Sequence, residues 1–180
     1  MESLDNFLTV ITPPERIKKD VRFFKDNFQQ RYGYFKSFSS TAHVSIGVSH
    51  VPTEKVEDFF NDVRNSISEI EPYDLQLQDF YYFRNGRVIY IDVAERDIFQ
   101  KIVKKIKLTS ALHGISEHCS YSDYPYMTIA RNLSVPVFNR AQVDYFSKNY
   151  EETFTVSKLN VLKWDSSEGK YNPFTELSLW

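Results

Sequence analysis

The chain has 180 residues, with 22 Lys and Arg against 24 Asp and Glu and a formal net charge of −2. This length predicts one domain with a sizeable core and disfavours solenoids and large two-domain enzymes. The near-neutral charge disfavours a polybasic nucleic-acid binder, which would carry a basic excess on one face. With 5 Gly there is no glycine-rich loop to cradle phosphates, and the single Cys119 excludes an internal disulfide and every multi-cysteine zinc site.

The N-terminal segment shows no targeting signal. Its apolar run, residues 7–11, is far shorter than the core of a signal peptide or a membrane span of about 20 residues. A single cysteine is usual in a reducing compartment. We therefore expect an unprocessed, soluble, cytoplasmic protein with no membrane partner.

Strand and helix patterns alternate twice at the start of the chain. Residues 7–11 are β-branched and apolar and predict a strand, and residues 15–32 repeat apolar positions at helical spacing. A second strand is predicted over 42–51. Thr53-Glu54 then opens a second helix that continues to about residue 70.

The rest of the chain begins with a predicted hairpin. Residues 73–83 and 87–93 are joined by Asn85-Gly86, the strongest short-range hairpin signal. The remaining predicted elements are a helix over 95–108, a polar loop up to 125, a strand over 126–131, a helix over 137–149 and two closing strands over 153–164 and 171–179.

The predicted element order is β-α-β-α-β-β-α-β-α-β-β. It indicates an α+β fold with two similar lobes, each an antiparallel sheet backed by helices. Because no low-complexity linker separates the two, we expect residues 1–180 to form a single bilobed domain.

Two predicted strands carry the same polar-apolar-hydroxyl-apolar pattern. In His43-Val44-Ser45-Ile46, strand alternation places His43 and Ser45 on one face together with Gly47, about 7 Å apart along the strand. Tyr126-Met127-Thr128-Ile129 has the same layout in the second half of the chain. One His-x-Ser triplet means little, and a second occurs at His118-Cys119-Ser120. The pairing of two such strands, one in each predicted lobe, is what indicates a site.

These motifs and the element order resemble the two-histidine phosphoesterase superfamily, which includes bacterial 2′-5′ RNA ligase-like proteins and RNA 2′,3′-cyclic phosphodiesterases. The resemblance covers essentially the whole chain. It implies a bilobed fold with pseudo-two-fold symmetry and a central cleft, a monomer without metal or cofactor, and a nucleotide or RNA terminus as ligand. The first motif matches well, whereas Tyr126 stands where the second motif of the family has its histidine.

The resemblance also implies a role for each motif residue. His43 would be the base, Tyr126 the acid or a hydrogen-bond donor, and Ser45 and Thr128 the phosphate ligands. An imidazole, with an ordinary pKa near 6.5, populates both protonation states at neutral pH. The phenol of a tyrosine, ordinarily with a pKa near 10, can donate a proton but is a poor base.

The tyrosine leaves more than one function open. The first is a metal-independent phosphoester hydrolase acting on a cyclic phosphate or a 2′-5′ phosphodiester of RNA ends or small nucleotides. The alternative is a catalytically weakened relative that binds nucleotide or RNA without turnover. A further hypothesis is that the side chain of His118, in the loop before the second motif strand, enters the site and replaces the missing imidazole. A protein-interaction module without nucleotide binding is the third class.

Other residues have a structural and a functional interpretation. Arg131 should point away from Thr128 by alternation and form a structural salt bridge. A lysine stripe is typical of the solvated face of a helix, with an RNA-backbone contact as the alternative; it comprises Lys101, Lys104, Lys105 and Lys107. Four aromatic residues before the motif strands should pack under loops, with base stacking as the alternative; they are Phe35, Phe38, Tyr121 and Tyr124.

Overall fold

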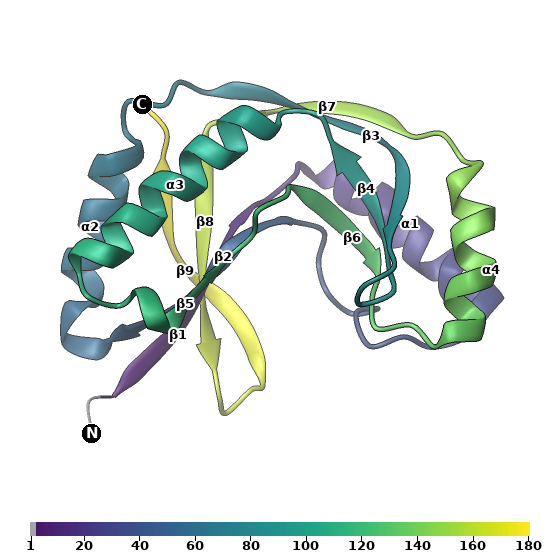
Figure 1. Ribbon diagram of the computed structural model, residues 1–180, viewed down its shortest axis with the longest axis horizontal. Helices are drawn as coiled ribbons and strands as arrows, with labels where there is room; N and C mark the ends of the chain where they lie inside the picture. Colours follow the sequence, from purple (N-terminus) through teal and green to yellow (C-terminus); the bar gives the residue numbers. More distant parts are fainter. Residues whose placement is uncertain (1–2) are drawn as a thin grey trace.

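A computed structural model gives the fold of residues 3–180 (Figure 1). In this part of the chain the fold is α+β, with four α-helices and one large antiparallel sheet. The helices are α1 (Glu15–Tyr32), α2 (Val56–Ile67), α3 (Arg96–Leu112) and α4 (Val135–Phe146). The strands are β1 (Leu4–Ile11), β2 (Val44–Pro52), β3 (Tyr73–Phe83), β4 (Val88–Val93), β5 (Cys119–Tyr121), β6 (Tyr126–Ala130), β7 (Glu151–Val156), β8 (Lys158–Asp165) and β9 (Lys170–Ser178).

Local sequence sets the clearest boundaries. Glu15 lies in the first turn of α1 and Arg31 in its last turn, where their charges complement the helix dipole, and the chain leaves the helix at Gly33 with a φ of 88°. The predicted helix over 15–32 is confirmed. The predicted β3–β4 hairpin is also confirmed, with positive φ at Gly86 and Arg87, as tight hairpin turns require.

The sheet is continuous, so the two predicted sheets are one. Its strand order is β7-β3-β4-β6-β2-β1-β8-β9, with β5 on the outer part of β2. The order is symmetric about the β6–β2 pair, which is joined through Val44 opposite Met127. We call β2, β1, β8, β9 and β5 the first half-sheet, and β6, β4, β3 and β7 the second half-sheet.

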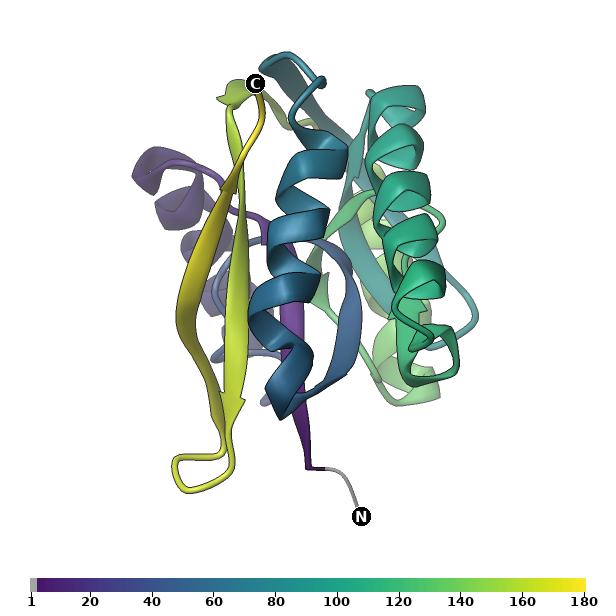
Figure 2. The ribbon, with the colours of Figure 1, turned by 90° about the vertical axis from the view of Figure 1, so that its left-hand side faces the viewer.

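The helices are exchanged between the half-sheets. Helix α1 follows β1 of the first half-sheet but packs on the second, where Phe24 contacts Phe80 of β3 with ring centroids 5.1 Å apart. Helix α3 follows β4 of the second half-sheet but packs beside α2 on the first, and Figure 2 shows these two helices side by side. Within residues 3–180, no helix combines the length and the apolarity that crossing a membrane requires.

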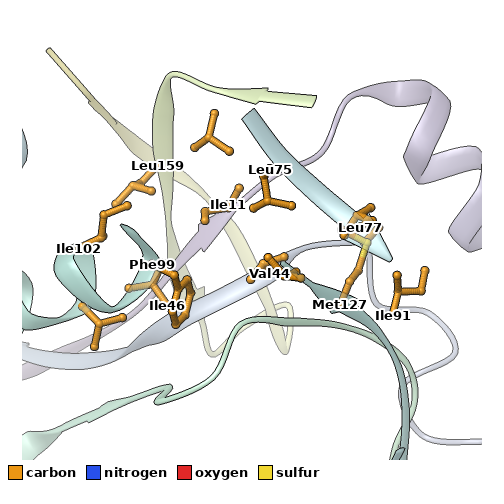
Figure 3. Close-up of a cluster of buried hydrophobic side chains, with 14 of the residues drawn as sticks. Ile11, Val44, Ile46, Leu75, Leu77, Ile91, Phe99, Ile102, Met127 and Leu159 are labelled. Atoms are coloured by element: carbon orange, nitrogen blue, oxygen red, sulfur yellow. The ribbon is translucent and has the colours of Figure 1, made fainter. Parts of the chain in front are cut away.

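One hydrophobic core runs across both half-sheets. Figure 3 shows buried side chains from both half-sheets and from α3 in a single cluster. They include Val44 and Ile46 of β2, Met127 of β6, Leu75 and Leu77 of β3, Ile102 of α3 and Leu159 of β8. The motif strands β2 and β6 therefore lie at the centre of the sheet, with one face on this core.

Two predicted elements differ from the structure. The strand expected over 153–164 is two strands, β7 and β8, in opposite half-sheets. Burial alternates at Phe154 and Val156 and then shifts phase to Leu159 and Val161, because Ser157 separates the strands. The loop expected before Tyr126 contains β5, which pairs with β2.

Candidate functional site

The four predicted site residues lie around the junction of β2 and β6. Val44 and Met127 are partners across the junction and are both fully buried on the core face. Continuing this antiparallel register by one residue sets His43 opposite Thr128 and Ser45 opposite Tyr126, on the other face of the sheet. All four side chains are half-buried. Side chains directly opposite each other in such a pair have Cβ atoms about 5 Å apart, so these four form one compact group.

Each motif strand contains a β-bulge directly after its hydroxyl residue. Ser45 pairs with Val10 and Gly47 with Thr9, so Ile46 is an extra residue in β2. Thr128 pairs with Tyr90 and Ala130 with Ile89, so Ile129 is the extra residue in β6. A bulge shifts the alternation of side chains, and the buried positions of β2 change phase there. Gly47 therefore does not share a face with His43, and that prediction is wrong.

Gly47 is instead the point where β5 approaches β2. A Cβ atom at this position would lie 2.6 Å from the carbonyl oxygen of Ser120 and 2.4 Å from the ring of Tyr121. Only glycine allows this approach. Beyond it, Tyr121 shares a hydrogen bond of 3.0 Å with Ser49, which is buried under α3.

The second bulge also changes the expected position of Arg131. With one extra residue before it, Arg131 does not point away from the site, and its charge lowers the pKa of both His43 and Lys25. The guanidinium is therefore within electrostatic range of the imidazole. Arg131 is exposed and takes part in none of the ion pairs between described residues, which contradicts the predicted structural salt bridge.

The imidazole of His43 is held in one tautomer. Its Nδ1 lies 2.8 Å from the carbonyl oxygen of Thr41, and because a carbonyl can only accept, Nδ1 carries the hydrogen. Burial lowers the pKa of His43, the hydrogen bond to Thr41 opposes that effect, and the charges of Lys25 and Arg131 lower the pKa further. The neutral ring then presents Nε2 as a proton acceptor.

The loop before His43 is fixed by a buried lysine that the sequence analysis missed. Lys25 of α1 is 1% exposed and donates hydrogen bonds to the carbonyl oxygens of Ser37 (3.0 Å) and Ser40 (2.7 Å) and to the Ser40 hydroxyl (2.8 Å). Burial lowers the pKa of this ammonium to about 8, with the charges of Arg22 and Arg131 acting in the same direction. The signal was available, because Lys25 falls between Val21 and Phe28 on the buried stripe of α1.

Tyr126 belongs to a group of four aromatic side chains on the second half-sheet, which we call the ring cluster: Phe83, Tyr90, Tyr124 and Tyr126. Phe83 stacks on Tyr90 at 4.3 Å and meets Tyr126 edge-on at 5.1 Å. Tyr124 donates a hydrogen bond of 2.7 Å to Asp92, which also accepts one of 2.9 Å from Arg96. Burial and the bond to Asp92 raise the pKa of Tyr124 to about 12.

A groove of roughly 440 Å³ extends from His43 across the first half-sheet. We call it the His43 groove. Its apolar lining includes Val10, Leu162 and Pro173, and its polar lining includes Asn160 and Glu176. A second hollow, of roughly 490 Å³, lies along α1 and meets the groove at Lys18, Thr41 and Ala42.

His118, Phe35 and the lysine stripe of α3 lie outside the group of four site residues. His118 lies beside His50, where Cys119 pairs with Ser49, several residues along β2 from His43, so it does not replace an imidazole at the site. Phe35 is buried against Phe28 and is unavailable for stacking. Among the lysine stripe, Lys105 pairs with Glu69 and Lys107 with Asp123, as expected of a solvated helix face.

No group of three or more His, Cys, Asp and Glu side chains in residues 3–180 is arranged to hold a metal ion. The arrangement offers a neutral imidazole, a phenol, two hydroxyls and nearby cationic charge. This set can hold an anionic tetrahedral group and move protons to and from its oxygens.

Several solved structures are similar to this chain. Apo LigT of E. coli has 15% sequence identity and a TM-score of 0.72, with 99% of both chains covered. TT0787 of Thermus thermophilus has 14% identity and a TM-score of 0.73 over 97% of both chains. Usb1 of Kluyveromyces marxianus has 10% identity and a TM-score of 0.57 over 99% of both chains. At these identities the likeness shows the fold alone. No curated protein matches the sequence.

A sequence model described as the 2′-5′ RNA ligase superfamily matches residues 13–168. The match includes both motif strands and all four helices. It agrees with the fold shared with LigT and TT0787. The chain therefore belongs to the 2′-5′ RNA ligase superfamily.

Proposed function

We propose that the protein is a phosphoester hydrolase that opens a 2′,3′-cyclic phosphate or cleaves a 2′-5′ phosphodiester in RNA ends or small nucleotides. The observation that carries the proposal is the grouping of His43, Ser45, Tyr126 and Thr128 across the β2–β6 junction. Membership of the superfamily supports activity on nucleotides or RNA. E. coli LigT, a structural relative, has been crystallised with 3′-AMP and with phosphate.

The proposed step needs only side-chain chemistry. Nε2 of His43 takes a proton from water as the water oxygen forms a bond to phosphorus, and the bond from phosphorus to one ribose oxygen breaks. Tyr126 gives its phenolic proton to that leaving oxygen. Ser45 and Thr128 donate hydrogen bonds to the non-bridging oxygens, and the charge of Arg131 stabilises the transition state. Solvent then returns the proton from the imidazolium to the phenolate.

Tyr126 also supports a second candidate function, a protein that binds nucleotide or RNA without turnover. In this interpretation Tyr126 replaces a catalytic histidine and belongs to the ring cluster as a packing residue. Losing one acid–base group typically lowers the rate by about 10²–10⁴-fold. Such a loss leaves a binding site with little turnover.

Substitution of Tyr126 distinguishes the two functions. The purified protein is assayed against nucleoside 2′,3′-cyclic phosphates and a 2′-5′ dinucleotide, beside Tyr126→Phe and Tyr126→His. If Tyr126 is the acid, the wild type turns over and Tyr126→Phe loses about 10²–10⁴-fold in kcat. The matched control Tyr34→Phe, at an exposed tyrosine, keeps full activity.

The binding function has a different outcome. The wild type shows nucleotide binding by calorimetry and no turnover, and Tyr126→His creates turnover at an otherwise intact site. A protein that neither turns over nor binds any of these ligands contradicts both functions.

A further inference from the structure

The His43 groove is a hollow that the proposed chemistry does not use. It begins at His43 and follows β1, β8 and β9, on the side of the imidazole away from the ring cluster. Its volume of roughly 440 Å³ falls within the range of small-molecule sites. A phosphate held at His43 would therefore have an open space beside it for the group attached to that phosphate.

The lining of the groove fits a planar ligand with a polar edge. Leu162 and Pro173 give apolar surface, and the amide of Asn160 lies beside them with one hydrogen-bond donor group and one acceptor. The amide nitrogen of Asn160 has a long contact of 3.4 Å with Glu176, and the amide makes no other hydrogen bond within residues 3–180, so its carbonyl oxygen and its other hydrogen can face a ligand. An asparagine amide can pair with the edge of a base through a donor and an acceptor together.

The charges of the region orient such a ligand. Glu176 lines the groove and forms an ion pair of 2.7 Å with Lys158. At the other end, the positive charges of Lys25 and Arg131 lie close enough to His43 to lower its pKa. A carboxylate repels phosphate oxygens but accepts a hydrogen bond from an amino group. The phosphate end therefore belongs near His43, and an uncharged end with an exocyclic amine belongs near Glu176.

The ring cluster is the competing place for a base, and it is less suited. Phe83 and Tyr90 stack on each other at 4.3 Å, and Tyr126 has rings at 5.1 Å and 5.3 Å. The faces that Phe83 and Tyr90 turn toward each other are therefore closed to a base. The His43 groove, in contrast, is an open hollow.

We propose that the His43 groove is a nucleobase subsite that holds the amino-bearing base of the nucleotide whose phosphate lies at His43, with Asn160 pairing with the base edge. This inference rests on the proposed function for the position of the phosphate. It goes beyond that function by naming the part of the ligand that the β8–β9 side of the site selects.

Binding of three probes to the purified full-length chain tests the subsite. The probes are adenosine 3′-monophosphate, ribose 5-phosphate and inorganic phosphate, each titrated by NMR. The base-carrying probe should bind at least about tenfold more tightly than the other two and should shift the side-chain amide signal of Asn160. Asn160→Ala and the groove-filling Leu162→Trp should each remove that advantage and leave phosphate binding unchanged.

One matched control and the use of two test variants keep the test decisive. Leu108→Trp places the same bulk on an exposed position of α3 and should change no affinity. Asn160→Ala keeps the test valid if Leu162→Trp fails to fold. Equal affinity for all three probes overturns the subsite, as does loss of nucleotide affinity in Phe83→Ala but not in Asn160→Ala.

The binding titrations, combined with a turnover assay of the same variants on nucleoside 2′,3′-cyclic phosphates, separate this inference from the proposed function. Tight nucleotide binding that depends on Asn160, without turnover of any cyclic phosphate, rejects the hydrolase and supports the subsite. Turnover that is insensitive to Asn160 and Leu162 supports the hydrolase and rejects the subsite. If no probe binds, the subsite is rejected.

Discussion

The protonation of His43 decides what the site can do chemically. Its Nδ1 hydrogen is engaged by the carbonyl oxygen of Thr41, and burial lowers its pKa from the usual 6.5, assisted by the charges of Lys25 and Arg131. An imidazole with a lowered pKa is mostly neutral at pH 7, so Nε2 is free to take a proton. A neighbouring carboxylate would have the opposite effect on the pKa.

Removing Arg131 should therefore change the pH dependence of the reaction. The activity of the wild type should fall at acid pH, with a midpoint below the ordinary imidazole value because the pKa of His43 is lowered, since protonated His43 cannot act as a base. Arg131→Ala removes a positive charge near the ring, so the pKa of His43 rises and the acid limb moves to higher pH. An NMR titration of the His43 ring, together with kcat/KM against pH, measures both.

The control for this prediction is Arg64→Ala, which removes a cation on α2. It should leave the His43 titration unchanged. Because Arg131 is exposed and unpaired among the described residues, its removal should not lower stability. An unchanged pKa of His43 in Arg131→Ala contradicts its position beside the imidazole.

The pattern of single residues could predict part of this site and not the rest. His43 and Ser45 alternate along an apolar strand, as do Tyr126 and Thr128, and this period of two is visible in the sequence. The bulges at Ile46 and Ile129 are set by pairing with neighbouring strands, so local alternation cannot reveal them. The prediction that Arg131 points away from Thr128 is wrong because it assumes regular alternation through Ile129.

At the scale of elements, α1 supports the site through Lys25. The ammonium fills a position that an apolar side chain would otherwise occupy and fixes the loop between α1 and β2 through three hydrogen bonds. Burial lowers its pKa from 10.5 to about 8. The folded protein thus holds this proton less tightly than the unfolded chain does.

This difference predicts a dependence of stability on pH. Between pH 8 and pH 10.5 the unfolded chain binds more protons at Lys25 than the folded protein, so stability rises with pH in that window. The full effect is about 3 kcal/mol. The free energy of unfolding of the wild type, measured by urea denaturation, should gain about this much relative to Lys25→Met across the window.

The comparison with Lys25→Met cancels the other groups that titrate at these pH values. Lys25→Arg serves as a second reference, because its guanidinium remains charged throughout. The difference in free energy of unfolding between the wild type and each variant should rise from pH 8 to pH 10.5. A difference that falls or stays constant contradicts a buried Lys25 ammonium with a lowered pKa.

The elements themselves were predictable to different degrees. Helix α1 and the β3–β4 hairpin have strong local signals, a helical apolar period and an Asn-Gly turn, and both are confirmed. The only sequence sign that 153–164 divides into β7 and β8 is a change in the alternation of apolar residues between Val156 and Leu159. The prediction of one long strand overlooks this change. The short β5 depends on the close approach to Gly47 rather than on its own sequence.

At the scale of the whole molecule, the exchange of helices ties the half-sheets together. Tyr150, which precedes β7, donates a hydrogen bond of 2.9 Å to Asp20 of α1, and Phe28 of α1 contacts Tyr145 of α4. Each half-sheet is thus covered by one helix from each half of the chain. Neither half can complete its core alone, so we propose that the chain folds as one domain.

Denaturation with two local fluorescent probes tests this. Trp180→Phe leaves Trp164 of β8 as the reporter of the first half-sheet. Replacing both tryptophans by Phe and adding Phe146→Trp gives a reporter on α4, at an exposed position over the second half-sheet. One cooperative unit requires the same urea midpoint for both probes, after correction for the stability of each variant by circular dichroism. Midpoints that differ would show independent halves.

The most direct test of the central claim is the turnover of nucleoside 2′,3′-cyclic phosphates by wild type and His43→Ala. The site described above predicts turnover by the wild type and a loss of at least about 10²-fold in His43→Ala. His50→Ala, at a histidine farther along the same strand, should retain full activity. Turnover that survives His43→Ala, or none by the wild type at high protein concentration, would contradict His43 as the base of a phosphoester hydrolase.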